Sequence, residues 1–298
     1  MTRVSSIVAA LLLGCSNGAP GAGDSGAQDA TPDAGPIGGD RPLATLRTPD
    51  GWDQKTPLPL LLVLHGYGVG GLAQAIYFGV LPLVEEKQII VAAPDGLLDK
   101  NGKRYWNAVD TCCDFDKRGN DDVKYLTGLV EDIAARMPVD RKRVYLLGHS
   151  NGGAMSMRLA CDKTGTFAAV FELAGPFWSN PPAQCAPATP IALRVLHGTA
   201  DKDVPYDGGG AMFAGPSAPA LAAFFASKNG CAPTPDTSPA PFDLEASIAG
   251  AETKVTRFGG CPAGGDVELW SIEGGGHIPD LAPGFRDVVW QFLSAHAR

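Results

Sequence analysis

Residues 144–161 have the sequence VYLLGHSNGGAMSMRLAC. An apolar run, 144–147, passes directly into Gly148-His149-Ser150-Asn151-Gly152, and a helix-like segment follows at once. A G-x-S-x-G pattern between a strand and a helix is typical of a nucleophile elbow, where the serine lies on a sharp, strained turn. Side chains two positions before or after that serine would collide with neighbouring backbone, which explains both glycines. The stretch therefore predicts that Ser150 is a nucleophile.

On both sides of this stretch, short apolar runs alternate with helix-like segments. The predicted strands are residues 58–64, 88–93, 144–147, 168–173, 191–196 and 267–272. The predicted helices are residues 72–87, 121–137 (with Asn120 or Asp121 as N-cap), 152–161 and 285–296, whereas 205–219 and 233–241 are predicted loops. This alternation predicts an α/β fold with a mostly parallel central sheet covered by helices on both faces, in a single domain.

A serine hydroxyl needs a base that accepts its proton, and the base needs a carboxylate that orients it. Asp201 and His277 each follow a later predicted strand. The order Ser150, Asp201, His277 is the order found in α/β-hydrolases. Asp203 is an alternative to Asp201, because it too lies between the end of its strand and the next apolar residue.

The oxyanion that forms when a serine attacks a carbonyl needs backbone N–H donors that are already in place. Asn151, directly after the serine, is expected to supply one of them at the start of its helix. The loop after the first core strand, Leu64-His65-Gly66-Tyr67-Gly68, is expected to supply the second through Tyr67. The alternative is that this loop is glycine-rich without a catalytic part.

The cysteines favour disulfides. Six of the seven lie beyond the N-terminal segment: Cys112, Cys113, Cys161, Cys185, Cys231 and Cys261. Sequence cannot choose among the 15 possible pairings of six thiols. Cys231 and Cys261 flank a polar, proline-rich insertion and are the best pair, whereas Cys112 and Cys113 bond either to each other or to the remaining two. A zinc site is disfavoured because no C-x-x-C pair is present.

The N-terminal residues are expected to form an export signal rather than part of the fold. A short apolar run ends in Leu12-Leu13-Gly14-Cys15, which resembles a bacterial lipoprotein signal (1–15) with Cys15 as the lipidated residue. An ordinary secretory signal is the alternative. Residues 16–40 are rich in Gly, Ala, Pro and Asp and predict a disordered linker, so that the catalytic domain spans 41–298. We therefore expect export to the cell surface, the outer membrane or the medium, with membrane contact only through the lipid anchor.

Composition limits the partners. The chain has 298 residues with 24 Lys+Arg against 32 Asp+Glu, a net charge of −8, and no basic run, so nucleic acid is not an expected partner. The chemistry of a serine, a histidine and an aspartate requires neither a metal nor an organic cofactor, and none is expected. We expect a monomer whose partner is its substrate.

Eight short motifs follow one another along the chain: LLLVLHGYGVGG (60–71), PDG (94–96), WN (106–107), CC (112–113), DDV (121–123), GHSNGG (148–153), HGTADKDVPY (197–206) and EGGGH (273–277). As a set they resemble the polyhydroxybutyrate depolymerase and feruloyl esterase group of secreted α/β-hydrolases. The resemblance implies ester hydrolysis through an acyl-enzyme, with Ser150, Asp201 and His277 matching the triad of that group. It implies feruloylated or acetylated polysaccharide, polyhydroxyalkanoate or small esters as substrates, without choosing among them.

Four aromatic residues are candidates for lining a substrate cleft: Trp106, Phe177, Trp178 and Tyr206. Each is alternatively a packing residue. The group commonly has Trp-Pro-Gly close behind the catalytic histidine, whereas this chain has Ile278-Pro279-Asp280. The resemblance therefore leaves in doubt the wall of the acyl pocket that this segment would form. A non-catalytic surface lipoprotein that binds glycan or polymer is the alternative function, and a peptidase that uses the same three residues is another.

Overall fold

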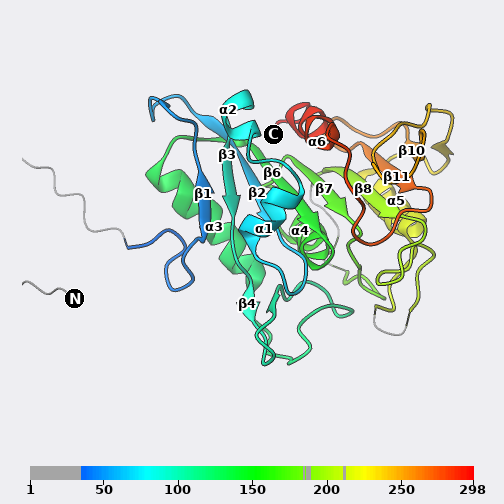
Figure 1. Ribbon diagram of the computed structural model, residues 1–298, viewed down its shortest axis with the longest axis horizontal. Coiled ribbons are helices and arrows are strands. Elements are labelled where there is room, and N and C mark those ends of the chain that lie inside the picture. Colours follow the sequence, from blue (N-terminus) through cyan, green and yellow to red (C-terminus); the bar gives the residue numbers. More distant parts are fainter. Residues whose placement is uncertain (1–34, 184, 186–188, 211–212) are drawn as a thin grey trace, which may run out of the picture. The chain divides into compact units, whose positions relative to one another are not determined.

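The computed structural model describes residues 35–183, 185, 189–210 and 213–298. Their central feature is a nine-stranded sheet in the order β1-β3-β2-β6-β7-β8-β11-β10-β9 (Figure 1). The strands are β1 (Thr45–Arg47), β2 (Leu58–Leu64), β3 (Ile90–Ala93), β6 (Val139–His149), β7 (Ala169–Leu173), β8 (Ala192–Gly198), β9 (Pro235–Asp236), β10 (Thr253–Phe258) and β11 (Val267–Ile272). The strands from β3 to β11 in this order are parallel, and β1, β10 and β9 pair antiparallel at the two edges. The mostly parallel sheet that the sequence predicts is therefore confirmed.

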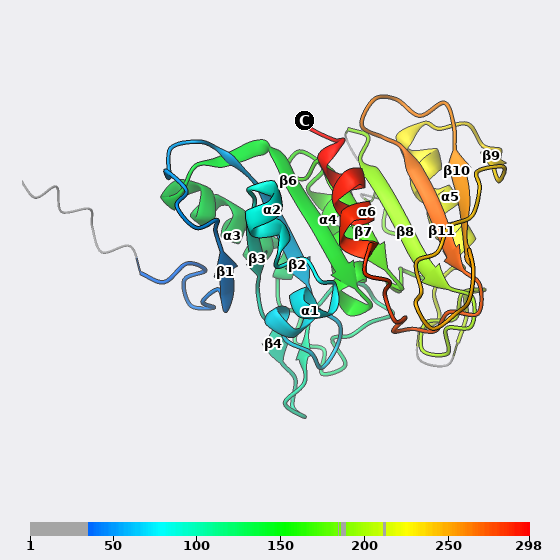
Figure 2. The same ribbon diagram turned by 45° about the horizontal axis from the view of Figure 1, so that its top comes forward.

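Helices cover both faces of the sheet. They are α1 (Gly71–Tyr77), α2 (Leu83–Lys87), α3 (Asp122–Arg136), α4 (Asn151–Asp162), α5 (Ala218–Asn229) and α6 (Phe285–Ser294). Buried side chains of α3, α4 and α5 share one core, and those of α1, α2 and α6 share the other (Figures 1 and 2). Each face of the sheet thus has its own apolar layer.

Strand β2 shows why a central strand of this sheet has apolar residues at every position. All seven of its residues are buried. Leu60, Leu62 and Leu64 belong to one core, while Leu61 and Val63 belong to the other, because successive side chains point to opposite faces of a sheet. A strand covered on both faces needs apolar residues at every position.

Two predictions of secondary structure are wrong. Residues 72–87 form two helices rather than one, because the chain turns at Gly79, with φ of +64°, and continues through Pro82 to α2. Residues 205–219 are not entirely a loop, because α5 starts at Ala218, and neither α5 nor the antiparallel strand β10 is predicted from the sequence. Ser217 caps α5 by accepting a hydrogen bond from the Ala220 N–H, and this serine with the following proline is the signal that could have revealed the helix.

The six cysteines of the described residues form three disulfides. Cys231 is bonded to Cys261, as expected. The adjacent Cys112 and Cys113 are bonded to each other, and Cys161 is bonded to Cys185, which resolves the alternatives that the sequence left open.

The folded unit begins a few residues before the predicted boundary at Arg41. It starts at Pro36. Ile37 packs against the core and the Gly38 N–H donates to Asp132 at 2.8 Å, so the last residues of the predicted linker 16–40 are bound to the domain. The predicted lipidation site, Cys15, lies outside the described residues. In the described segments, no helix has both the length and the apolar character needed to cross a bilayer.

Candidate active site

Ser150 occupies the turn between β6 and α4. Its backbone has φ of +53° and ψ of −119°, a conformation that residues with a side chain rarely adopt. The Ser150 N–H donates to the Leu173 carbonyl of the neighbouring strand β7 at 2.8 Å. The surrounding sheet and helix thus hold the strained turn that exposes the serine side chain at the carboxyl edge of the sheet.

Both glycines of the turn are sterically required. A Cβ at Gly148 would lie 2.2 Å from the Gly152 carbonyl oxygen, and a Cβ at Gly152 would lie 2.1 Å from the Leu64 carbonyl oxygen. Either contact is far inside van der Waals distance, and the atom on the other side is backbone that cannot move away. The helix can therefore start close against the end of β2 only because these positions lack side chains.

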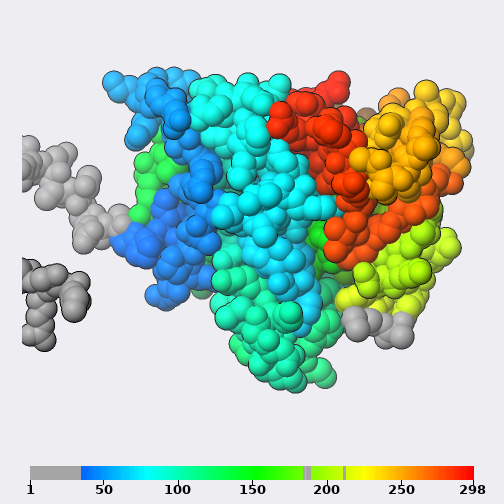
Figure 3. Space-filling view, in the orientation of Figure 1, coloured from blue at the N-terminus to red at the C-terminus, as the bar shows by residue number. Residues whose placement is uncertain are grey.

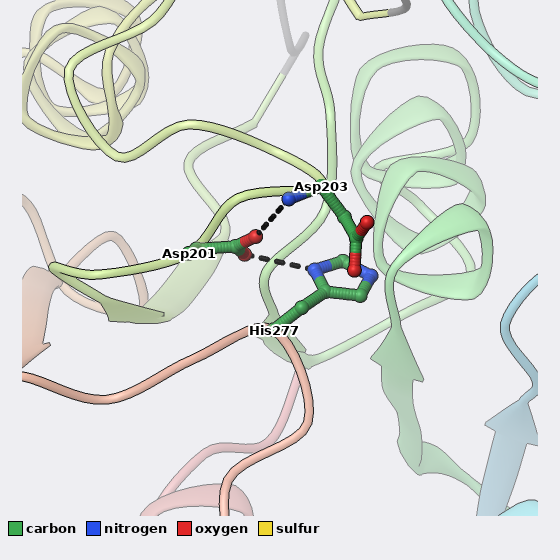
Figure 4. A group of neighbouring side chains, drawn as sticks. All are labelled: Asp201, Asp203 and His277. Carbon is green, nitrogen blue, oxygen red and sulfur yellow. Dashed lines mark hydrogen bonds and ion pairs between the residues drawn. The ribbon is translucent and has the colours of Figure 1, made fainter.

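Ser150, His277 and Asp201 are joined by hydrogen bonds although they are far apart in the sequence. The Ser150 Oγ lies 2.9 Å from His277 Nε2, and His277 Nδ1 lies 2.8 Å from Asp201 Oδ2 (Figure 4 shows the latter). Asp201 follows β8 and His277 follows β11, so both side chains reach the serine from the same edge of the sheet. The structure brings together the three residues that the sequence singled out.

Asp201 is held as a charged, oriented carboxylate. Its Oδ1 accepts hydrogen bonds from the Asp203 and Val204 N–H groups at 2.9 Å each, and its Oδ2 faces His277 and lies 3.3 Å from His197 Nε2. Burial raises the pKa of Asp201, but hydrogen bonds from His197 and His277 outweigh it and hold the pKa well below its ordinary value. An ionised Asp201 requires the proton of His277 to be on Nδ1, which leaves Nε2 free to accept from Ser150.

Asp203, the alternative carboxylate, has a different position. It contributes its backbone N–H to Asp201, while its exposed side chain points toward the imidazole ring (Figure 4). The donor atoms of Asp201, Asp203 and His277 lie within 4.8 Å of one another, the only such group of metal-ligand type in the described part of the chain. Because Asp201 and Ser150 already engage both nitrogens of His277, we assign this group to hydrogen bonding rather than to a metal.

The two expected oxyanion donors lie beside the serine. Asn151 is the first residue of α4, and in the described residues neither its N–H nor that of Tyr67 donates to a protein group. A Cβ at Gly66 would lie 3.5 Å from the Ser150 Cβ, so the loop that carries Tyr67 passes directly over the elbow. Both N–H groups are thus without a protein acceptor among the described residues, on segments that adjoin Ser150.

Side chains that the sequence analysis did not single out fix this loop. The His65 Nε2 accepts from the Gly96 N–H at 2.8 Å, so its Nδ1 carries the proton and donates to the Gly66 carbonyl at 2.7 Å. Burial lowers the pKa of His65 to about 4, which keeps the ring neutral. The Gly66 N–H donates to the buried Gln74 of α1. A histidine directly before the glycine of this loop was the available signal.

His149 and His197 contact His277 and Asp201. His149 Nε2 lies 2.9 Å from the His277 carbonyl oxygen, and burial lowers the pKa of His149 to about 4, so a neutral ring donates this bond. His197 Nε2 donates to the Val204 carbonyl at 2.8 Å and faces Asp201. From the sequence alone, neither histidine has an expected role beyond its place in the motifs GHSNGG and HGTADKDVPY.

The aromatic residues proposed for a substrate cleft are mostly internal. Trp106 is completely buried, and its backbone N–H and carbonyl both bond to the Asn151 side chain at 2.7 and 2.9 Å. The prediction that Trp106 lines a substrate cleft is therefore wrong. Its backbone positions the start of α4 instead. Phe177 and Trp178 are buried as well, and only Tyr206 is partly exposed, with its hydroxyl 2.6 Å from the Ser271 hydroxyl.

Glu172 is a carboxyl group enclosed completely in the core beneath the elbow. One of its oxygens accepts the Gly175 N–H at 2.8 Å, and the other has no partner among the described residues. Burial raises the pKa of Glu172 to about 8, against a smaller lowering by the Gly175 N–H, so the group is largely protonated at neutral pH. The carboxyl fits there only because Gly153 and Gly175 have no Cβ, which would lie 2.9 and 2.7 Å from it.

A strained serine after a central parallel strand, with a histidine and an aspartate after later strands, defines this protein as an α/β-hydrolase. Comparison with known proteins leads to the same class. Residues 53–214 match the phospholipase/carboxylesterase family. The chain belongs to this family and is a carboxylic ester hydrolase.

Similar proteins include two fungal esterases. Feruloyl esterase D of Neurospora crassa is 28% identical over 270 residues, which cover 84% of this chain and 80% of that protein. Feruloyl esterase C of Emericella nidulans is 30% identical over 263 residues, covering 84% and 83%. Among solved structures, acetyl xylan esterase from Aspergillus awamori has a TM-score of 0.60 at 16% identity and covers 86% of this chain and 96% of that one. This structural likeness supports the fold.

Proposed function

We propose that this protein is an exported serine esterase that cleaves carboxylic esters through an acyl-enzyme on Ser150. The observation that carries the proposal is the continuous chain of hydrogen bonds from the Ser150 hydroxyl through His277 to Asp201. Its two distances, 2.9 and 2.8 Å, lie within the range in which a proton can pass from a nucleophile to a base.

In the acylation step, His277 Nε2 removes the proton of Ser150 as its oxygen attacks the ester carbonyl. The buried negative charge of Asp201 stabilises the imidazolium that forms. His277 then donates this proton to the oxygen of the leaving alcohol as the bond between carbonyl carbon and alkoxy oxygen breaks. In deacylation, the same nitrogen takes a proton from water as the water oxygen attacks the acyl carbonyl carbon. The bond between that carbon and the Ser150 Oγ then breaks, His277 returns the proton to the Ser150 oxygen, and the acid leaves.

The negative charge that develops on the carbonyl oxygen is stabilised by the N–H groups of Tyr67 and Asn151. Both are fixed before substrate arrives, Tyr67 by the bonds of His65 and Gln74 to Gly66, and Asn151 by its side-chain bonds to Trp106. Preorganised donors of this kind need no rearrangement at the moment of reaction.

As substrates we propose feruloyl or acetyl esters of plant polysaccharide, with polyhydroxyalkanoate-type polyesters as the second class. The names of the two fungal relatives support feruloyl esters, and both matches extend over most of the chain. We also propose that Cys15 is lipidated after export and that the linker that follows it tethers a monomeric domain to the membrane. Labelling with radioactive palmitate should disappear in Cys15→Ser.

The test is a parallel assay of residues 36–298 on methyl ferulate, acetylated xylan, p-nitrophenyl esters and a polyhydroxybutyrate film. We expect turnover of a ferulate or acetyl ester, labelling by a fluorophosphonate probe, and loss of both in Ser150→Ala, with kcat lower by on the order of 10⁴ to 10⁶. Folding of the variant is checked by circular dichroism. Loss of less than tenfold would remove Ser150 from this role, and the absence of both labelling and turnover in the wild type would overturn the proposal.

A further inference from the structure

A groove of about 650 Å³ lies between α6 and the part of the sheet formed by β8, β10 and β11, and we term it the α6 groove. One wall is α6 and the other is the segment that precedes β10, which Figure 3 shows in gold beside the red surface of α6. None of its described lining residues belongs to the proposed triad. The volume is in the range of small-molecule sites.

The α6 groove lies toward the opposite end of the strands from Ser150. Arg194 on its floor is four positions before Gly198, the last residue of β8. At roughly 3.3 Å per residue, this corresponds to about 13 Å along the strand. Asp201 follows that carboxyl end, and Figure 2 shows α6 on the same side of the sheet as the groove, beside β11 and β10. A ligand in the groove is therefore bound apart from the candidate active site.

A row of charged residues crosses the floor of the groove, on strands where apolar residues are expected. Arg257 of β10 lies opposite Glu268 of β11, and Glu268 lies opposite Arg194 of β8. Two positions further along their strands, Trp270 and Leu196 occupy the same face and belong to the apolar layer beneath α6. The apolar layer thus ends at this row of charges, where the groove begins.

Both carboxylates of the groove are engaged by protein donors. Glu268 Oε1 accepts from Arg257 Nε at 2.5 Å, and its Oε2 lies 3.1 Å from Arg194 Nε. Asp266 Oδ1 faces His296 Nε2 at 2.5 Å, and its Oδ2 accepts from Arg194 Nη1 at 2.8 Å. A neutral ligand rich in hydroxyl groups, such as a sugar, therefore finds no free carboxylate to accept its hydrogen bonds.

The histidine of the groove carries a positive charge. His296 Nδ1 lies 2.8 Å from the Phe292 carbonyl oxygen, and both this oxygen and the Asp266 carboxylate can only accept, so both ring nitrogens hold protons. Burial raises the pKa of Asp266, but the hydrogen bond from His296 and the charge of Arg194 outweigh it and hold the pKa well below its ordinary value. The charged lining side chains sum to +1, in a chain whose net charge is −8: Arg194, Arg257 and His296 against Asp266 and Glu268.

Arg257 offers donors that the protein does not use. Its Nε bonds to Glu268, whereas no hydrogen bond or ion pair to the described residues uses Nη1 or Nη2, and the side chain is 54% exposed. Asp236, opposite Arg257 on β9, does not line the groove and accepts from the Ser238 N–H. Unused guanidinium donors beside engaged carboxylates select an anionic ligand, and the guanidinium fork fits a carboxylate.

The rest of the lining is largely apolar and aromatic. Phe242 and Trp270 meet edge to face with ring centres 5.0 Å apart, and Phe292 lies under the Arg194 guanidinium at 4.2 Å. Phe242 on one wall and Val288 of α6 on the other are only partly buried. A planar ring can pack against such side chains in offset or edge-to-face arrangements.

We propose that the α6 groove is a second binding site that takes an aromatic carboxylate, with the carboxylate on Arg257 and the ring between Phe242 and Val288. Ferulate, the acid that a feruloyl ester releases, belongs to this class. The choice of ferulate rests on the proposed function, whereas the site itself does not. Because the groove is apart from Ser150, ferulate bound there does not compete with an ester for the serine.

The experiment is isothermal titration calorimetry of the full chain with sodium ferulate at pH 7. For a ligand of this size we expect a dissociation constant of about 1 mM or lower. Arg257→Gln should weaken binding about tenfold or more, because hydrogen bonds between charged groups are the strong ones. A second variant, Val288→Asp, places a negative charge on the other wall and should weaken binding as well. The matched control Arg47→Gln makes the same change in net charge on exposed β1, at the far edge of the sheet, and should leave the affinity unchanged.

Three further ligands test the chemical class. Coniferyl alcohol has the ring of ferulate without the carboxylate, hexanoate is an aliphatic carboxylate, and galacturonate is a polar one. Each should bind about tenfold more weakly than ferulate or not at all. Equal affinity for any of the three would overturn the assignment to an aromatic carboxylate. Absence of ferulate binding to the wild type, or equal affinity in Arg257→Gln, would overturn the site.

Blocking Ser150 separates this site from the active site. Ferulate binding should persist after a fluorophosphonate has reacted with the serine, and its loss would place ferulate in the active site and overturn the proposal. The folds of the variants are compared by thermal unfolding, and Arg257→Gln should keep the wild-type kcat on p-nitrophenyl acetate. If the wild type bound ferulate through Arg257 but hydrolysed no ester, the proposed function would fail while the α6 groove stood.

Discussion

The two neighbouring aspartates make a sharp test of the proposed triad, because they differ in geometry and not in chemistry. In Asp201→Asn, the side-chain oxygen can keep both hydrogen bonds from the Asp203 and Val204 N–H groups. The new amide NH₂ then faces His277 Nδ1 at the position of Oδ2, 2.8 Å away. Two donors cannot share this contact, so the imidazole must place its proton on Nε2.

The wrong tautomer removes the base. With a proton on Nε2, His277 cannot accept from Ser150, whose Oγ lies 2.9 Å away. The same substitution in a serine protease triad lowers kcat about 10⁴-fold, which corresponds to roughly 5.5 kcal/mol of transition-state stabilisation, and we expect a loss of this order here. Asp203→Asn keeps the backbone N–H that holds Asp201, and its side chain is exposed. We therefore expect a change of less than about fivefold, since exposed charge pairs contribute little.

The assay is kcat on p-nitrophenyl acetate at pH 7 for the wild type and both variants, with near-ultraviolet circular dichroism to confirm the native fold. Fluorophosphonate labelling should be slowed in Asp201→Asn by a similar factor, because it requires the same activated serine. If Asp203→Asn were the inactive variant, or if both lost the same factor, the assignment of Asp201 as the orienting carboxylate would be refuted.

Three further variants test other parts of the structure. Since burial raises the pKa of Glu172 from an ordinary 4.5 to about 8, its contribution to stability is full below pH 4.5 and is lost as the pH rises to 8. Urea unfolding should thus show the wild type losing roughly 1.4 kcal/mol per pH unit relative to Glu172→Gln in this window, and a constant difference would contradict the buried acid. Asn151→Ala leaves the N–H and carbonyl of Trp106 buried without partners and should lower the free energy of unfolding by about 2 to 4 kcal/mol, with kcat reduced less than tenfold because the N–H of residue 151 remains. Replacing Cys231 and Cys261 by serine opens a loop of 30 residues and should cost about 3 to 4 kcal/mol, visible as a lower Tm; an unchanged Tm would show that the loop is held by other contacts.

The elbow could be predicted from the sequence because its requirements are local. Gly148 and Gly152 lie two residues from Ser150, and both are needed by backbone atoms that the strand and helix bring close. The choice between Asp201 and Asp203 could not be made in this way. Both belong to one short turn, and only the folded turn shows that the N–H of Asp203 points at Asp201 rather than the reverse.

Pairing and burial depend on contacts between segments that are distant in sequence. Whether Cys112 bonds to Cys113 depends on the position of Cys161, which the pattern of residues does not contain. Trp106 was a plausible cleft residue until its backbone was found hydrogen-bonded to Asn151, 45 residues later. An aromatic side chain after a strand can either line a cleft or pack in the core, so its role follows only from the packing.

Glu172 is the clearest case in which local pattern and structure disagree. It lies in the strand AVFEL, where a parallel strand covered on both faces should be apolar throughout, and its charged form would be costly. The conflict is resolved by Gly153 of α4 and Gly175 of the following loop, which leave space for the carboxyl and supply an N–H to one of its oxygens. Gly153 also belongs to the first turn of the helix that starts at the serine. A neutral acid in the core is therefore packed against the same helix start that presents Asn151. Substitution or ionisation of Glu172 is expected to alter the position of the elbow through this contact.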